Sequence, residues 1–152
     1  MASPDRAVTA SSLGAWVVKA SPGPAFVAEH VRTGFGALTT RCMRRSYRTD
    51  LVEAGQPVLL WISGRDPLTP AGIHAAGHTT GPVEDSSDGL VMPVELSAVA
   101  PPVLRVELVL DPLLARIEVL RMPAGSNPSY LTRSELAALA EQWPQLGGIV
   151  DG

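Results

Sequence analysis

The feature that most restricts the fold is an apolar run of strand length, Val58–Ile62 (VLLWI), near the middle of the chain. A turn centred on Gly55 precedes it, and small polar residues beginning at Ser63 follow it. A continuous apolar run of this length between turn residues is typical of a strand buried in the core. We therefore predict a core strand that opens into a short polar loop.

A cluster of basic residues lies immediately before this strand. Four arginines fall within eight residues, and Cys42, Met43 and Tyr47 lie among them: Arg41, Arg44, Arg45 and Arg48. A basic, aromatic-bearing segment beside a strand end would suit a flat ligand attached to a polyanion, such as a nucleotide. The alternative is a core strand beside an ordinary solvated loop, with the arginines exposed because they are charged.

Length and composition indicate one folded domain. The chain has 152 residues, of which 45% are apolar and 18% charged, enough to bury a sizeable core. We expect a disordered tail at 1–12, a single domain at 13–146 and a fraying tail at 147–152. No apolar run approaches the roughly 18 residues that span a bilayer. The single cysteine, Cys42, predicts a reducing cytosolic compartment.

The charge is unevenly distributed along the chain. Through Arg65 the sequence carries eight basic and four acidic residues, whereas from Asp66 onward it carries four basic and eleven acidic residues. The net charge of −3 therefore combines a basic first part with an acidic second part. This distribution suits localised phosphate contacts better than wrapping along a duplex.

Further strands are predicted at 15–20, 71–82 and 90–96. In the first of these, Trp16 and Val18 should share one face. The glycines of 71–82 indicate a close approach by another backbone or a ligand. His74 and His78 would stand about 13 Å apart on an extended segment, too far to bind one metal ion.

Helices are predicted at the margins of these strands. One begins at Pro24 and continues to about Gly34; a helical turn at 51–53 would have Asp50 as its cap. A capping box, Thr132–Glu135, opens a helix over 134–142. The segment 104–110 fits a strand or a helix, and 117–120 is expected to be extended.

These elements predict an α+β fold. Five or six short strands with two or three marginal helices form a small, strongly curved sheet or barrel. Glycine-rich phosphate loops, nucleophile elbows and paired-carboxylate signatures do not occur in the sequence.

Several landmarks occur in the order found in EVE domains. Trp16–Lys19 resembles their opening strand, and Ser46–Arg48 with Val58–Gly64 resembles their central motif. The segment Ala71–Gly77 resembles their Pro-Gly-Ile strand, and Asn127–Glu135 resembles their last strand and closing helix. The resemblance covers about 15–143, nearly the whole chain.

The EVE family belongs to the PUA-like superfamily, so the resemblance implies a pseudo-barrel with flanking helices and a concave pocket. Relatives use this pocket to read RNA or flipped-out, often modified, bases. It also implies a helix at 104–110. Many EVE domains carry a tryptophan where this chain has Arg41 and Cys42, and an aspartate where it has Gln56; a stacking aromatic is worth about 1–3 kcal/mol per base.

We therefore expect a non-enzymatic domain without a cofactor that binds DNA or RNA, possibly at a modified base. The candidate stacking faces are Trp16, Tyr47 and Trp61. The candidate edge contacts are Lys19, Ser46, Ser63, Gly64 and Asn127. The candidate phosphate contacts are Arg41, Arg44, Arg45, Arg48 and Arg65.

Two other classes of function compete with this hypothesis. The first is a protein-interaction module whose pocket has degenerated, which the missing tryptophan favours. The second is a hydrolase in which Cys42 pairs with His30, His74 or His78 as a thiolate and imidazole. A cysteine beside arginines can have a lowered pKa, whereas burial would raise it.

Overall fold

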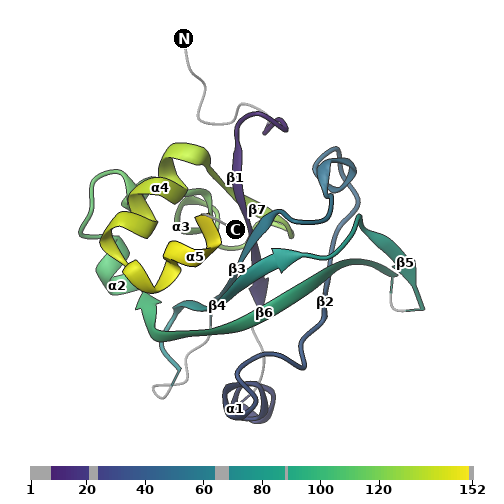
Figure 1. Ribbon diagram of the computed structural model, residues 1–152, viewed down its shortest axis with the longest axis horizontal. Helices are drawn as coiled ribbons and strands as arrows, with labels where there is room; N and C mark the ends of the chain where they lie inside the picture. The colour runs from purple at the N-terminus through teal and green to yellow at the C-terminus, as the bar shows by residue number, and fades with distance from the viewer. Residues whose placement is uncertain (1–7, 21–23, 64–68, 88, 151–152) are drawn as a thin grey trace.

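A computed structural model describes residues 8–20, 24–63, 69–87 and 89–150 (Figure 1). The strands are β1 (Leu13–Ala20), β2 (Thr40–Cys42), β3 (Pro57–Ile62), β4 (Gly72–Thr79), β5 (Glu84–Ser86), β6 (Gly89–Leu104) and β7 (Ser129–Thr132). The helices are α1 (Pro24–Arg32), α2 (Arg105–Leu108), α3 (Glu118–Arg121), α4 (Arg133–Gln142) and α5 (Gly147–Val150). Short 3₁₀ turns occur at η1 (Thr49–Leu51), η2 (Leu114–Arg116) and η3 (Pro144–Leu146).

All seven strands join one curled sheet. Its order is β2-β6-β4-β3-β1-β7, and β5 pairs with the beginning of β6. β1 and β3 pair in parallel, with Trp16 opposite Val58, and the other pairs among the described residues are antiparallel. Figure 1 shows α2 to α5 gathered on one side of the sheet and α1 apart from them. The predicted α+β class, a PUA-like curved sheet with flanking helices, is confirmed, with two three-residue strands added to the predicted set.

The two faces of the sheet are buried in separate cores. Ala15 and Val17 belong to a helix-side core that includes Leu108, Leu139 and other residues of the helices. Trp16 and Val18 belong to a second core with Phe35 and Val52. Successive side chains of a strand point to opposite faces of the sheet. The prediction that Trp16 and Val18 share one face is therefore confirmed.

The glycines of β4 permit close backbone packing. A Cβ on Gly77 would meet the carbonyl of Glu95, and one on Gly72 would meet the carbonyl of Val103, both in β6. Any larger residue at either position would push β4 and β6 apart. The close backbone approach predicted from these glycines is confirmed.

The helix predicted from Pro24 and the capping box before α4 are confirmed. Thr132 accepts from the Glu135 backbone at 3.2 Å, and the Glu135 carboxylate accepts from the Thr132 backbone at 2.9 Å. The open segment 104–110 contains α2 followed by a turn. None of the helices in the described part of the chain is long and apolar enough to cross a membrane.

Two local predictions are wrong. The segment 117–120 is expected to be extended, but α3 begins at Glu118. Ile117 and Val119 are each only 1% exposed, so packing against the helix-side core outweighs their local strand preference. Asp50 does not cap a helical turn, because it lies inside η1, whose N-cap residue is Arg48.

The ordered part of the chain extends beyond the predicted limits at both ends. Val8 is 2% exposed within the second core, and residues 9–12 form a hydrogen-bonded turn. At the other end, α5 occupies 147–150, and Ile149 is buried in the helix-side core. The predicted tails are therefore wrong for 8–12 and 147–150, because each segment covers apolar surface of the sheet or helices.

Candidate ligand-binding pocket

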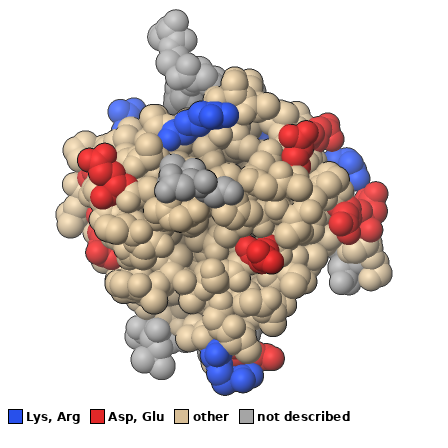
Figure 2. Space-filling model, in the orientation of Figure 1, with Lys and Arg blue, Asp and Glu red and all other residues tan. Residues whose placement is uncertain are grey.

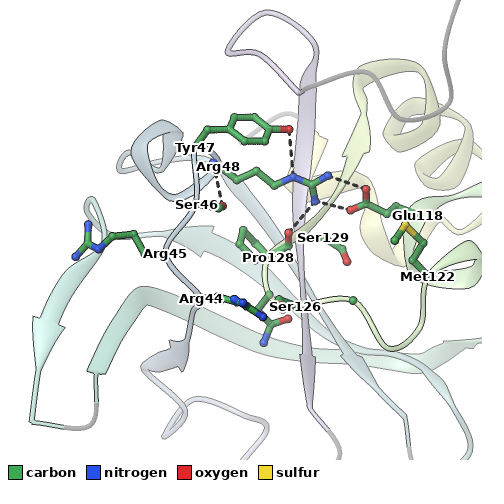
Figure 3. A pocket seen from close by; sticks show the side chains of 12 residues that line it. Arg44, Arg45, Ser46, Tyr47, Arg48, Glu118, Met122, Ser126, Pro128 and Ser129 are labelled. Atoms are coloured by element: carbon green, nitrogen blue, oxygen red, sulfur yellow. Dashed lines mark hydrogen bonds and ion pairs between the residues drawn. The ribbon is translucent and has the colours of Figure 1, made fainter.

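A concavity of about 270 Å³ opens between two segments that are distant in sequence (Figure 3). One wall comes from the arginine segment before η1, and the other comes from α3 and the loop leading into β7. The residues that line it are Arg44, Arg45, Ser46, Tyr47, Arg48, Glu118, Met122, Gly125, Ser126, Asn127, Pro128 and Ser129. Six of these residues are predicted site residues, and the other six are not.

Arg48 holds the two walls together. Its guanidinium makes a bidentate pair with Glu118, at 2.6 and 2.8 Å, and donates to the Pro128 carbonyl at 3.0 Å. It also lies over the ring of Tyr130, 5.0 Å from the centroid. The hydrogen bond to Glu118 raises the pKa of Arg48. Four of its five N–H donors are therefore used within the protein, and its predicted role in phosphate binding stays a prediction.

Tyr47 presents its ring at the pocket wall, with 48% of the residue exposed. Its hydroxyl oxygen accepts from the backbone N–H of Val8 at 3.1 Å and from Arg48 Nε at 3.3 Å. These two bonds fix the orientation of the ring from both sides. Ser46, which also lines the pocket, accepts from the backbone N–H of Arg48 at 3.1 Å. Tyr47 is thus the one predicted aromatic residue that the structure places at the pocket.

Asn127 is a structural clamp beneath the pocket. Its Oδ1 accepts from the Lys19 backbone at 2.8 Å, while Nδ2 donates to the carbonyls of Lys19 and Cys42 at 3.1 and 3.3 Å. Lys19 Nζ in turn donates to the carbonyl of Gly125. Burial lowers the pKa of Lys19, and the carboxylate of Glu118 partly offsets this effect. These polar atoms bridge β1, β2 and the loop before β7, and the predicted edge contacts of both side chains stay predictions.

Arg41 points away from the pocket. Its Nη2 donates to the carbonyl of Lys19 at 3.0 Å, and burial lowers its pKa. Its buried Nε has no hydrogen-bond partner among the residues that the structure describes. The predicted role of Arg41 as a phosphate contact at this site is therefore wrong.

Arg44 and Arg45 form the cationic rim. Arg45 pairs with Asp85 at 3.2 Å, and both side chains are more than half exposed. Exposed pairs of this kind contribute only about 0–1 kcal/mol, so a ligand phosphate can compete for Arg45. The guanidinium of Arg44 makes no hydrogen bond or ion pair with the described part of the chain, although its backbone N–H donates to Asn127. These two arginines remain as phosphate candidates.

The two tryptophans are core residues and not stacking faces. Trp16 is 0% exposed and donates its indole N–H to Gln56 Oε1 at 2.8 Å, whereas Trp61 is 3% exposed in the helix-side core. Ser63 follows β3, and its backbone N–H donates to the carbonyl of Ala20 at 2.9 Å. The predicted ligand contacts of Trp16 and Trp61 are therefore wrong, whereas that of Ser63 stays a prediction. Gly64 and Arg65 lie outside the described residues.

Ser129 is the most informative residue that sequence analysis missed. It is 2% exposed, lines the pocket and pairs through its backbone with Val17 of β1. Its hydroxyl makes no hydrogen bond to any residue that the structure describes. The hydroxyl is open to the pocket, so a ligand there could supply its hydrogen-bond partner in place of water. Its place in the resemblance to the last EVE strand was the available signal.

The histidines and Cys42 are the other residues considered for metal binding or catalysis. Among them, no three His, Cys, Asp or Glu side chains lie close enough to hold a metal ion. His74 is hydrogen-bonded through Nε2 to the carbonyl of Pro70 at 2.7 Å. Cys42 is exposed on β2. On the face shown in Figure 2, acidic and basic side chains are scattered and form no continuous basic surface.

Comparisons with known proteins establish the fold alone. No family model and no curated protein matches the chain. An NMR structure of a protein from Rhodopseudomonas palustris matches with a TM-score of 0.65 and 15% identity, over 88% of this chain and 95% of that one. A hypothetical protein from Leishmania major matches with a TM-score of 0.64 and 13% identity, over 91% and 99%. A protein from Agrobacterium tumefaciens matches with a TM-score of 0.60 and 14% identity, over 91% and 95%.

Proposed function

We propose that this protein binds a base of DNA or RNA in the pocket, without catalysis and in the cytosol. The observation that carries the proposal is the convergence of three groups on one concavity. These are the half-exposed ring of Tyr47, the hydroxyl of Ser129 and the guanidinium of Arg44, of which the last two have no partner among the residues that the structure describes. Together they offer an edge contact, an aromatic surface and a phosphate contact.

The size of the pocket fits a single ring system. Its volume of about 270 Å³ lies near the lower end of small-molecule sites, which span about 300–1,000 Å³. A base extruded from its stack would enter with its sugar and phosphates outside, beside Arg44 and Arg45. The resemblance to EVE domains supports the same function and extends it to modified bases.

We expect oligonucleotide binding to depend on salt, because Arg44 and Arg45 at the rim of the pocket would contact phosphates. Binding of short single-stranded DNA and RNA, followed by fluorescence anisotropy, should weaken as salt rises. The slope of log affinity against log salt should be about 0.7 per neutralised phosphate. Arg44→Ala should reduce this slope by about one phosphate equivalent. Arg105→Ala, an exposed arginine on α2 outside the pocket, is the matched control and should leave the slope unchanged.

Two results would contradict the proposal. One is the absence of binding to any of these oligonucleotides, and the other is binding that does not change with salt or with the Arg44 substitution. Either would favour the protein-interaction module, which has its own structural support. Val106, Val109, Leu110 and Leu113 form an exposed apolar stretch in and after α2, and Leu110 is 82% exposed. Leu110→Asp should then abolish association with a protein partner and leave the pocket intact.

A further inference from the structure

The polar groups around the pocket divide into acceptors that are occupied and donors that are free. Both carboxylate oxygens of Glu118 accept from Arg48, which also donates to the carbonyl of Pro128. The carbonyl of Gly125 accepts from Lys19. The main acceptors on the loop wall are therefore satisfied before a ligand arrives.

The donors on the other side of the pocket are not used. The hydroxyl oxygen of Tyr47 accepts two hydrogen bonds, but its proton is donated to no residue in the described part of the chain. The guanidinium of Arg44 can only donate. The hydroxyl of Ser129 is buried, lines the pocket and is available in either direction. A ligand therefore meets two groups that can donate, Tyr47 and Arg44, and the Ser129 hydroxyl, which can donate or accept.

We infer that the pocket selects a base whose inward edge carries a carbonyl oxygen, as in uracil, thymine or hypoxanthine, over one that carries an amino group. This inference rests on the proposed function, because it assumes that a base enters the pocket. A carbonyl oxygen has two lone pairs and can accept the proton of the Tyr47 hydroxyl. An amino group at the same position would oppose that proton with a second donor. Neither donor would then find a partner in the other.

The test compares oligonucleotides that differ at one base within the same flanking sequence. Uracil against cytosine and hypoxanthine against adenine each exchange a carbonyl oxygen for an amino group and the adjacent ring N–H for a ring acceptor. We expect the carbonyl member of each pair to bind about tenfold more tightly, the difference that one well-placed hydrogen bond makes. Tyr47→Phe should remove most of that preference while keeping the aromatic ring. Tyr130→Phe is the matched control, because Tyr130 stacks on Arg48 outside the pocket lining and should leave the preference unchanged.

The possible outcomes distinguish failure of the carbonyl preference from failure of base binding itself. Equal affinity within both pairs of bases, or tighter binding of the base with the amino group, overturns the inference. The proposed function would still stand in that case if binding remained dependent on salt and on Arg44. A preference that survives both Tyr47→Phe and Ser129→Ala also overturns it, because the selecting groups would lie elsewhere. Loss of binding to every oligonucleotide in the wild-type protein overturns the proposed function itself. Thermal melts monitored by circular dichroism show that each variant is folded.

Discussion

Thr79 and Ser129 are two buried hydroxyl residues of the same sheet, each 2% exposed, yet their surroundings differ. Thr79, at the end of β4, donates to the carbonyl of Glu53 and accepts from the Gln56 backbone at 2.9 Å. Ser129, at the beginning of β7, has no hydroxyl partner among the described residues and faces the pocket. The turn beside Thr79 is closed on itself, whereas the pocket beside Ser129 is built to be completed by another molecule.

The same contrast holds for the larger side chains in the two regions. Near Thr79, Gln56 accepts from the Trp16 indole and donates to the carbonyl of Leu51, so each strong polar atom is used within the protein. At the pocket, four of the five N–H donors of Arg48 are used within the protein, whereas the Arg44 guanidinium has no partner among the described residues. A positive charge alone therefore does not identify a ligand contact. The hydrogen bonds and ion pairs that a group already makes decide whether it is free to bind a ligand.

The largest expected effect is in the closed region. Trp16→Ala should lower the free energy of unfolding by about 3–5 kcal/mol, because it deletes a fully buried indole and leaves a cavity. Urea denaturation measures this change. Under conditions where the variant remains folded, its affinity for oligonucleotides should equal that of the wild type. Weak destabilisation combined with lost binding would mean that Trp16 is a ligand contact after all.

The next largest effect on stability concerns the ion pair between Arg48 and Glu118, which connects the two pocket walls. Glu118→Gln should lower the free energy of unfolding by about 2–3 kcal/mol, because it leaves the guanidinium of Arg48 half-buried and without its counterion. Asp85→Asn is the matched control. It removes the exposed partner of Arg45 and should cost less than about 1 kcal/mol. Equal losses of stability in the two variants would contradict a structural role for Arg48 that Arg45 does not share.

The smallest effect concerns Asp111, an exposed but fully bonded carboxylate. The backbone N–H of Leu114, the Gln142 amide and the backbone N–H of Leu113 lower its pKa. A lowered folded-state pKa adds stability that is present above the ordinary carboxyl pKa of about 3.9 and is lost as the pH falls through the folded value. The difference in melting temperature between wild type and Asp111→Asn should therefore shrink as the pH falls below about 4. A constant difference down to pH 2 would contradict this assignment.

Local patterns in the sequence were sufficient to predict much of the fold. The apolar run of β3, the alternation in β1 and the capping box of α4 each depend on a few neighbouring residues, and each is confirmed. The four-residue helix α3 is too short for a helical period to show. Its formation depends on burying Ile117 and Val119 against distant elements, which no local pattern reveals.

The pocket was only half predictable for a related reason. The arginine wall is continuous in sequence, so Arg44 to Arg48 could be recognised as a unit. The other wall is brought to it by tertiary contacts, and Glu118 lies 70 residues from its partner Arg48. Burial of Trp16 and Trp61, and the pairing that occupies Arg41 and Asn127, likewise depend on neighbours distant in sequence. Residue type suggested candidates, but only three-dimensional bonding separated free groups from occupied ones.

The most direct test compares Ser129→Ala with Thr79→Val by urea denaturation and by oligonucleotide titration. Ser129→Ala should change the free energy of unfolding by less than about 1 kcal/mol, because the hydroxyl makes no hydrogen bond to the described residues and opens into the pocket. It should also weaken oligonucleotide binding about tenfold. Thr79→Val should do the reverse, lowering stability by about 1–3 kcal/mol and leaving binding unchanged, since it strands the Glu53 and Gln56 backbone groups. A Ser129→Ala protein that is less stable and binds as well as the wild type would contradict the claim that this pocket is built for a ligand.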